Sequence, residues 1–595
     1  MNYIELFAGC GGLSLGLETA GFELLFANEL SPMASETFAH NLLGADLETN
    51  LNAEKVFWLS SQYSRENLDL RLRENPSLAS GLKNKFSDLE SVIKDDSALR
   101  RSLLVGSIID LNSFLGENKV LAKSISTGLG DGKVDLVSGG PPCQSFSLAG
   151  LRDRTNARNK LPWEFAKFIG MVKPKIALLE NVSGILNAFN DDGRQFYAWF
   201  EVAKAFANVG YVPLCLNVNA KFAGVAQNRP RFILIAINFG FYGKIKKNLK
   251  CKTFNKLIKS PLEFYRSIKK GDDPNYGELQ FYDAEEHLES FENSILSPLV
   301  SYYTKQHTVK DAIHDLLGEE EKESQYVKKL NRLFANHNKL PINKYHNHEL
   351  RKNSSKIKAR FRIYQLLPKL KKESASAISK YLKSSVEAVT EVSIQALAKS
   401  LSSVGQNSSI EIQSYLRSVE QNELSLELTV ILEKALISLE GYPRKEIRRH
   451  LKSKEEAKLP IKALHELKRF WLLDISGNKL RKPKIEQIEV LVSCLKTKKQ
   501  TQRVLLPEVP APAALSIPDD ACHYSESIDG LRTLTVREMA RIQSFPDWYE
   551  VKSKVTTGGE QRRFEVPQYT QMGNAVPPML GYALGQICKK LLSLS

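Results

Sequence analysis

The chain has 595 residues, 42% of them hydrophobic and 25% charged, which is the composition of a globular protein with two or three domains. It contains no apolar run of about 18 residues that could span a bilayer and no N-terminal secretory signal, so we expect an intracellular protein without a membrane role. The formal net charge of +16 favours a polyanionic partner.

The seven cysteines stand singly along the chain. None forms a CxxC pair, and none lies near histidines at the spacing of a zinc site. The sequence therefore predicts reduced thiols, with neither a disulfide framework nor a structural metal.

The chain begins with a short apolar segment, residues 3–7, that we predict to be a buried strand. It leads into a turn containing Gly9, Gly11 and Gly12, after which apolar residues recur at helical spacing. Glycines directly after a strand let the backbone turn tightly and approach a ligand at a helix N-terminus. A tight turn needed only for packing would have the same pattern.

A second predicted strand, residues 23–27, ends just before Glu29. In doubly wound folds an acidic side chain at this place, about 20 residues beyond the glycine turn, accepts hydrogen bonds from ribose hydroxyls. The turn and Glu29 together predict a cofactor that carries a nucleoside.

Further apolar runs at residues 134–137, 176–179 and 232–237 alternate with helical stretches. This alternation predicts an α/β fold with a doubly wound, mainly parallel sheet and helices on both faces. Residues 45–103 are charged and favour helix. We interpret them as an insertion between sheet elements and assign them no function.

Cys143 lies in the sequence Gly-Gly-Pro-Pro-Cys-Gln-Ser-Phe-Ser, just beyond the predicted strand at 134–137. The restricted φ angles of Pro141 and Pro142 make a rigid loop that presents the thiol at the sheet edge where active sites of this architecture lie. A cysteine is more often a small buried hydrophobe. The prolines, the polar residues that follow and the edge position favour a nucleophile here.

Three more charged residues adjoin predicted strands. Glu180 follows residues 176–179 and reaches the same edge, although a glutamate there can also simply face water. Arg229 and Arg231 precede residues 232–237, and alternate residues of an extended segment point to the same side. Two arginines so oriented suit contacts with phosphate or base oxygens, with solvated surface charge as the alternative.

The alternation of strand and helix fades between residues 241 and 519 into helical, lysine-rich sequence. This region ends in the proline-rich residues 506–512, which we interpret as a linker. A capped helix is predicted at 535–544 and a final apolar helix at 576–592.

In order along the chain, these motifs resemble those of the C5-cytosine DNA methyltransferase family. The matching segments are residues 7–13, Glu29, 139–147, 158–161, 180–182, 227–231, 532–547 and 569–578. Two segments depart from the family pattern. Gly106-Ser107-Ile108 stands where the family has Gly-Asp-Ile, and residues 223–226 read Ala-Gly-Val-Ala in place of an aromatic residue followed by Gly-Val-Pro.

The resemblance implies S-adenosyl-L-methionine as cofactor and a methyltransferase fold with a large inserted target-recognition domain. The residues that it implies for cofactor binding are Phe7, Gly9, Gly11, Gly12, Leu13, Glu29, Ser107, Ile108, Leu161, Asn574 and Val576.

It also implies four catalytic residues: Cys143, Glu180, Arg229 and Arg231. C5 of cytosine is a poor nucleophile until a group adds at C6, and a cysteine thiolate suits that covalent step. Glu180 would contact N3 and the exocyclic amine, while Arg231, helped by Arg229, would orient the ring and Cys143. The target base must leave the duplex stack to reach them.

The implied domain division has three parts. Residues 1–240 form the first part of the catalytic domain, with the insertion at about 45–103; residues 241–519 form the target-recognition region; and residues 520–595 complete the catalytic domain. Basic clusters at 356–362 and 444–449 lie in the recognition region, where they could contact DNA or belong to solvated helix faces.

The implied partner is double-stranded DNA, and the implied setting is a monomeric bacterial enzyme of the cytoplasm, paired with a restriction endonuclease. Because the first motif begins almost at Met1, we expect no N-terminal targeting region. An RNA methyltransferase of the same fold and a binding-only relative remain alternatives. The long insert favours DNA, and the presence of Cys143 and Glu180 favours an enzyme.

Overall fold

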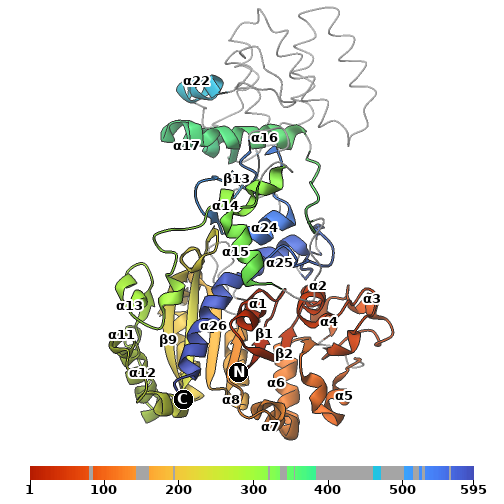
Figure 1. Cartoon of the computed structure of the whole chain (residues 1–595), viewed down its shortest axis with the longest axis vertical. Coiled ribbons are helices and arrows are strands. Elements are labelled where there is room, and N and C mark those ends of the chain that lie inside the picture. Colours follow the sequence, from red (N-terminus) through yellow and green to blue (C-terminus); the bar gives the residue numbers. More distant parts are fainter. Residues whose placement is uncertain are drawn as a thin grey trace, which may run out of the picture. The chain divides into compact units, whose positions relative to one another are not determined.

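The computed structural model describes the chain except residues 80–84, 143–159, 192–193, 319–321, 336–344, 354, 384–459, 471–496, 498–500, 514–520, 526–529, 560 and 562–563. The chain divides into two compact units. The first comprises Met1–His348, Pro507–Ser516 and Val536–Ser595, and the second comprises Glu349–Leu506 and Ile517–Thr535. Figure 1 shows the elements of both.

One sheet forms the centre of the first unit. Its strands in chain order are β1 (Asn2–Leu6), β2 (Glu23–Glu29), β3 (Val56–Trp58), β4 (Ser102–Val105), β5 (Leu136–Gly139), β6 (Ile176–Val182), β9 (Tyr211–Asn219), β11 (Pro230–Asn238) and β12 (Phe281–Asp283). Their spatial order is β12-β9-β11-β6-β5-β1-β2-β4-β3. Only β11 runs antiparallel to its neighbours in this sheet. The predicted α/β class with a mainly parallel sheet is therefore confirmed.

The first unit also contains helices. They are α1 (Gly12–Thr19), α2 (Pro32–Phe38), α3 (Leu68–Arg71), α4 (Pro76–Ala79), α5 (Leu89–Lys94), α6 (Ile108–Glu117), α7 (Lys119–Ser126), α8 (Leu161–Val172), α9 (Ala198–Asn208), α10 (Phe239–Ile245), α11 (Lys252–Leu257), α12 (Lys259–Lys270), α13 (Leu288–Glu292), α14 (Val309–Ile313), α15 (Gln325–Leu333), α24 (Val536–Ile542), α25 (Gln568–Asn574) and α26 (Pro578–Leu592). Helix α8 packs on α6, α7 and α9, while α1 packs along α26, beside which it is drawn in Figure 1. The first and last helices of the unit are thus direct neighbours.

The central strands are buried because they are apolar on both faces, as expected for a sheet covered by helices on both sides. All residues from Phe232 to Ile237 in β11 are 0% exposed. The predicted strands at 3–7, 23–27, 134–137, 176–179 and 232–237 correspond to β1, β2, β5, β6 and β11. Strands β3, β4, β9 and β12 were not predicted.

The insertion predicted at 45–103 contributes to the sheet instead of lying wholly outside it. Strand β3 forms the sheet edge, and it pairs with β4, which begins at Ser102. Arg71, 1% exposed, is paired with Asp88 and lies over the Trp58 ring. Such contacts give the inserted residues a packed interior of their own.

The boundary predicted at 240/241 falls inside the first unit. Residues 241–348 belong with the sheet because α12 packs on α9 and β9, and because β12 pairs with β9. The predicted linker at 506–512 also packs there: β14 (Ala511–Pro512) pairs with β10 (Gln227–Asn228), and the Val309 N–H donates to the Val509 carbonyl. Proline ends the helical pattern as predicted, but the segment is not a free linker.

The second unit has its own core. Its described elements are α16 (Ser355–Leu366), α17 (Lys372–Lys383), α22 (Ile461–Phe470) and the paired strands β13 (Arg503–Val504) and β15 (Ala521–Cys522). Buried residues from each helix form this core, among them Tyr364, Ile378 and Leu464. Arg360 and Arg362 of the first basic cluster are 8% and 5% exposed, so they do not belong to a solvated helix face. The second cluster, at 444–449, lies outside the described residues.

No helix in the described part of the chain has the length and apolar character needed to cross a membrane.

Candidate active site

Several of the described residues predicted for the site lie at one end of the sheet, where β4, β2, β1, β5 and β6 end side by side. Pairing brings Glu29 of β2 opposite Val105 of β4, and Leu6 of β1 opposite Gly139 of β5. Gly139 in turn lies opposite Leu179 of β6, which is followed by Glu180. The carboxyl ends of parallel strands are where ligands bind in open α/β sheets.

The glycine turn and Glu29 are held together directly. The Gly9 N–H donates to Glu29 Oε2 at 2.7 Å, and the Ser31 N–H donates to Glu29 Oε1 at 2.8 Å. Burial raises the pKa of Glu29, and the two backbone donors oppose that rise. A Cβ added at Gly9 would meet no atom within 4 Å, so open space adjoins the turn at this carboxylate.

Gly11 and Gly12 face protein and not open space. A Cβ at Gly12 would lie 2.2 Å from the Val576 carbonyl oxygen, and one at Gly11 would lie 2.6 Å from Leu42 Cδ1. Gly11 also has a φ of +86°, which favours glycine. Both glycines are therefore required for packing, and a cofactor contact at either stays a prediction.

The other residues predicted to bind the cofactor divide by exposure. Phe7, Glu29, Ser107, Leu161, and Val576 are partly exposed, and Asn574 is exposed, whereas Leu13 and Ile108 are buried. Of the residues that are not buried, Phe7, Glu29 and Ser107 stand at or just after the ends of β1, β2 and β4. Leu13 and Ile108 can act only through packing or backbone atoms.

Ser107, which replaces the family aspartate, is the N-cap of α6. Its hydroxyl accepts a hydrogen bond from the Ile109 N–H at 3.2 Å. The preceding residue is fixed by Asn28, whose Nδ2 donates to the Gly106 carbonyl at 3.0 Å. The serine thus keeps the capping role that an aspartate would have, without its negative charge.

The loop predicted to carry the nucleophile starts at the end of β5. Its described part reaches Pro142, and Cys143 lies outside the described residues, as do residues 144–159. Asn181, which follows Glu180, donates from Nδ2 to the Pro141 carbonyl at 3.0 Å. A buried side chain of β6 therefore holds this loop two residues before Cys143.

Glu180 and Arg231 form a buried ion pair. Arg231 Nε lies 2.6 Å from Glu180 Oε1, and each side chain is 10% exposed. Burial lowers the pKa of Arg231, and the negative charge of Glu180 opposes that change. Glu180 Oε2 is the nearest atom to a Cβ built on Gly140, at 3.2 Å, so the pair adjoins the start of the Cys143 loop.

Arg229 is also buried, but it contacts a different segment. Its Nη2 donates to the carbonyls of Gly573 and Ala575, at 3.1 and 2.9 Å, on either side of Asn574. Its Nε has no hydrogen-bond partner among the described residues. Burial lowers the pKa of Arg229, and the positive charge of Arg231 lowers it further. Surface solvation, the alternative for both arginines, is excluded by their burial.

Several residues at this edge were not singled out from the sequence. Gln571 donates from Nε2 to the Met33 carbonyl at 3.2 Å, and its Oε1 accepts from Thr37 at 2.6 Å. The Tyr549 hydroxyl donates to the Cys10 carbonyl in the glycine turn. Gln571 and Tyr549 lie within the matching segments or close to them, but only the fold reveals their partners, which are more than 500 residues away.

Comparisons with known proteins found bacterial relatives of this chain. The chain is 32% identical over 237 residues to the type II methyltransferase M.DdeI of Desulfomicrobium norvegicum, covering 40% of each chain. It is 29% identical over 287 residues to M.PspPI of a Psychrobacter species, covering 48% of each. The matching part thus spans less than half the length of these relatives. The solved Dnmt2 methyltransferase of S. pombe aligns with a TM-score of 0.36 at 12% identity over 99% of each chain.

The family model described as C-5 cytosine-specific DNA methylase matches residues 1–55 and 117–590, which include the glycine turn, Cys143, Glu180, both arginines and the C-terminal helices. The gap in the match, residues 56–116, contains β3, β4 and the departing Gly106-Ser107-Ile108. The chain belongs to the C-5 cytosine-specific DNA methylase family.

Proposed function

We propose that this protein transfers a methyl group from S-adenosyl-L-methionine to C5 of cytosine in double-stranded DNA. The observation that carries the proposal is the buried pair of Glu180 and Arg231, 2.6 Å apart beside the loop that leads to Cys143. Family membership supports the same reaction.

The residues at the strand ends fit this cofactor. The Glu29 carboxylate lies at the end of β2 next to open space at Gly9, where it can accept hydrogen bonds from ribose hydroxyls. Phe7 and Val576 are partly exposed at the same edge and can contact the adenine, while Ser107 offers a hydroxyl in place of a carboxylate. When bound, S-adenosylmethionine supplies an electrophilic methyl group on a sulfonium.

Cys143 is the proposed nucleophile. Its thiolate forms an Sγ–C6 bond with cytosine, and the electron pair displaced from the C5–C6 double bond makes C5 nucleophilic. After C5 gains the methyl group, loss of the C5 proton and cleavage of the Sγ–C6 bond restore the ring and the thiolate. Pro141 and Pro142 restrict the backbone just before Cys143, and Asn181 holds the Pro141 carbonyl.

Glu180 and Arg231 are the proposed groups that bind the ring. Negative charge develops on the ring when sulfur adds, and a proton shared between Glu180 and N3 offsets it. Arg231 neutralises the Glu180 carboxylate and can donate to the base oxygen. Arg229 has a different proposed role. By holding the carbonyls of Gly573 and Ala575, it positions Asn574, which lies between them and is predicted to bind the cofactor.

The substrate is proposed to be duplex DNA with the target cytosine turned out of the stack, since its C5 and C6 are inaccessible inside the helix. The net charge of +16 favours a polyanionic substrate. Residues 241–519 are the proposed target-recognition region. Because the relatives above are named type II methyltransferases and come from bacteria, we also propose a companion restriction endonuclease and a bacterial cytoplasmic location. That the enzyme is a monomer is a separate proposal.

Transfer of a labelled methyl group from S-adenosylmethionine tests the proposal. Purified protein is incubated with mixed-sequence duplex DNA, with the same DNA already methylated at C5, and with structured RNA. We expect incorporation into unmethylated DNA alone, at 5-methylcytosine after nucleoside digestion. Incorporation into RNA instead would favour the alternative RNA methyltransferase. Absence of incorporation with all three substrates, at saturating cofactor, would contradict an enzymatic role.

A further inference from the structure

The glycine turn after β1 receives a hydrogen bond from a distant tyrosine. The Tyr549 hydroxyl donates to the backbone carbonyl of Cys10, which lies between Gly9 and Gly11. Tyr549 is 0% exposed, and burial raises the pKa of its hydroxyl, so the group stays protonated and able to donate. The donor belongs to the segment that follows α24, far from the turn in sequence.

The turn is shaped to receive this hydroxyl. A Cβ added at Gly11 would lie 2.9 Å from the Tyr549 oxygen and 3.0 Å from Phe38 Cδ2, so a larger residue there would displace the tyrosine. On the other side of Cys10, Gly9 donates its N–H to Glu29, the proposed ribose ligand. The hydroxyl therefore holds the middle of a turn in which the adjacent residue, Gly9, contacts the proposed ribose ligand Glu29.

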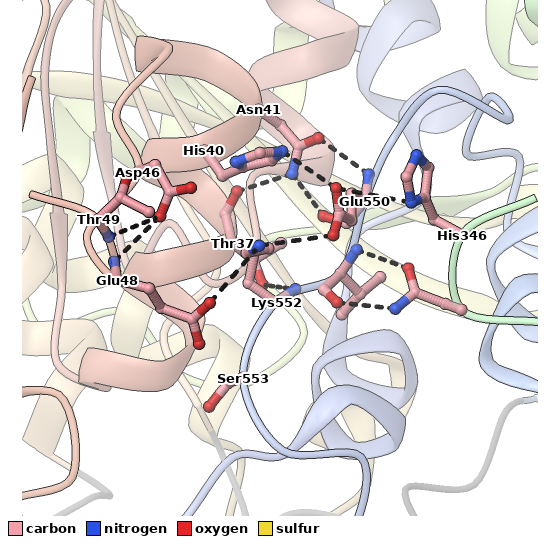
Figure 2. Close-up of polar contacts among 12 residues, drawn as sticks. Thr37, His40, Asn41, Asp46, Glu48, Thr49, His346, Glu550, Lys552 and Ser553 are labelled. Atoms are coloured by element: carbon pink, nitrogen blue, oxygen red, sulfur yellow. Dashed lines mark hydrogen bonds and ion pairs between the residues drawn. The ribbon is translucent and has the colours of Figure 1, made fainter. Parts of the chain in front are cut away.

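Tyr549 is itself held firmly by its backbone. Arg537 Nη2 donates to the Tyr549 carbonyl at 2.6 Å. The backbone of the next residue, Glu550, exchanges two hydrogen bonds with the Asn41 side chain, at 2.6 and 3.0 Å, as Figure 2 shows. Asn347 does the same for Val551, at 2.8 Å for each bond.

Side chains add further contacts to this segment. The Lys552 N–H donates to Thr37 Oγ1 at 2.9 Å, and the Glu550 carboxylate pairs with His40 at 3.3 Å (Figure 2). Backbone and side-chain contacts thus fix residues 549–552 independently of the tyrosine hydroxyl. Removal of that hydroxyl alone should leave the segment in place and release only the turn.

We propose that Tyr549 is a positioning residue for the cofactor: its hydroxyl holds the Gly9–Gly11 turn in the conformation that binds S-adenosylmethionine. This inference rests on the proposed function. Without the hydroxyl, the Cys10 carbonyl loses its partner, and the turn spends part of its time in other conformations. Apparent affinity falls in proportion to the fraction of protein in the binding conformation.

Tyr549→Phe removes the donor and keeps the ring. We expect the Kd for S-adenosylmethionine, measured by calorimetry on the full chain, to rise about fivefold, the equivalent of about 1 kcal/mol for one hydrogen bond. The KM for cofactor should rise similarly, while kcat at saturating cofactor and the KM for DNA change little. A 4-aminophenylalanine at position 549 restores a donor and should restore affinity.

Tyr211→Phe is the matched control. Tyr211 is also 0% exposed, and its hydroxyl donates to a backbone carbonyl, that of Pro174, at 2.7 Å. Pro174 precedes β6, so this bond lies at the amino end of that strand, whereas the candidate site lies at the carboxyl ends of the strands. Tyr211→Phe should lower the Tm about as much as Tyr549→Phe and leave the cofactor Kd unchanged.

The outcomes separate the two proposals. If the wild-type chain binds cofactor and Tyr549→Phe binds it equally well, the positioning role is overturned while the proposed function stands. Equal losses of affinity in Tyr549→Phe and Tyr211→Phe would likewise overturn it, since a general loss of stability would then explain both. A wild-type chain that binds no S-adenosylmethionine would overturn both the positioning role and the proposed cofactor.

Discussion

Arg541, Arg231 and Arg229 are among the buried arginines of the first unit, and the charge of each is compensated differently. Arg541 contacts two carboxylates, with Asp547 at 2.6 Å and Asp315 at 2.7 Å. Arg231 has one carboxylate, Glu180, and Arg229 has backbone carbonyls as its acceptors among the described residues. Glu180→Gln and Glu180→Ala both leave the buried Arg231 charge without its carboxylate, which typically costs about 3–5 kcal/mol. Gln keeps the side-chain volume and one hydrogen-bond acceptor, so Glu180→Gln is the cleaner catalytic probe.

Glu550 provides a prediction on pH. Its carboxylate pairs with His40 and Lys552. A hydrogen bond from His40, together with the positive charges of Lys552 and His40, lowers the pKa of Glu550 to about 2. Because this pKa lies below the ordinary value of 4.5, the stabilisation is complete above about pH 4.5 and is lost as the pH falls toward 2. Glu550→Gln should therefore lower the free energy of unfolding at pH 7 by about 1–2 kcal/mol, allowing for solvent screening.

Denaturant titrations at several pH values between 7 and 3 test this expectation. The difference between Glu550→Gln and wild type should shrink steadily below pH 4.5. Glu508→Gln is the control, because Glu508 is 74% exposed and lies 3.7 Å from Lys310. It should change stability by less than about 0.5 kcal/mol at any pH. A Glu550→Gln difference that persisted unchanged at pH 3 would contradict the assigned cause.

Residue positions at strand ends could be predicted from the sequence, but their partners could not. Glu29 and Glu180 lie where a polar residue ends an apolar run, and that local pattern is enough to place them at the sheet edge. The acceptors of Arg229 lie more than 340 residues away, and the acceptor of Tyr549 lies 539 residues away. The spacing of nearby residues in the sequence cannot predict contacts over such separations. They depend on how α26 and the segments before it return to the sheet.

At the scale of elements, the packing of α1 on α26 depends on glycine. A Cβ on Gly16 would lie 2.4 Å from the Tyr582 backbone nitrogen and 2.6 Å from the Pro578 carbonyl oxygen. Gly16→Ala should force the two helices apart and lower the free energy of unfolding by about 1–3 kcal/mol, as measured by denaturant titration.

Gly116→Ala is the control for Gly16→Ala, since Gly116 also lies within a helix, α6, but a Cβ there would meet no atom within 4 Å. Alanine favours helix over glycine by about 1 kcal/mol, so this variant should be as stable as wild type or more stable. If Gly16→Ala were also neutral, close packing of α1 on α26 would be refuted.

The composition and length of a strand decided whether it could be predicted from the sequence. Strands β6 and β11 are long apolar runs and were predicted. Strand β9 is as long as β11 but contains Pro213, which argues against a central strand in a sequence pattern. Strands β3 and β12 have three residues each, too few for a periodicity. Their pairing comes from the neighbouring strands.

At the scale of the whole molecule, the first unit is assembled from three segments of the chain. Sequence composition predicted an inserted region that begins at residue 241, whereas the second compact unit begins at Glu349. Helices α10 to α15 have the same helical, lysine-rich character as the inserted region, yet the first unit includes them. Composition indicates local secondary structure. Whether a helix belongs to the first or the second unit depends on which apolar surfaces it packs against.

The net charge of +16 predicts a strong salt dependence of DNA binding, since each phosphate contact releases counterions. Arg448→Ala with Arg449→Ala should flatten the slope of log affinity against log salt by up to about 2, if both contact phosphate. Fluorescence anisotropy over a salt series measures the slope.

The control removes the same charge through Lys589→Ala with Lys590→Ala. Lys589 Nζ donates to the Ala20 carbonyl, just before β2 begins, so this pair lies at the sheet edge opposite the candidate site. Its slope should equal that of wild type. Equal slopes for both double variants would show that Arg448 and Arg449 do not contact DNA phosphates.

The central claim, covalent catalysis by Cys143, is tested most directly with duplex DNA that carries 5-fluorocytosine at the target. The fluorine cannot leave as the C5 proton does, so the adduct should be trapped after one methyl transfer. In the presence of S-adenosylmethionine, we expect a protein–DNA complex that survives denaturation, with peptide mapping placing the cross-link at Cys143. Cys143→Ala should form no complex yet still bind the duplex. A cross-link at another cysteine, or an undiminished yield from Cys143→Ala, would contradict the mechanism.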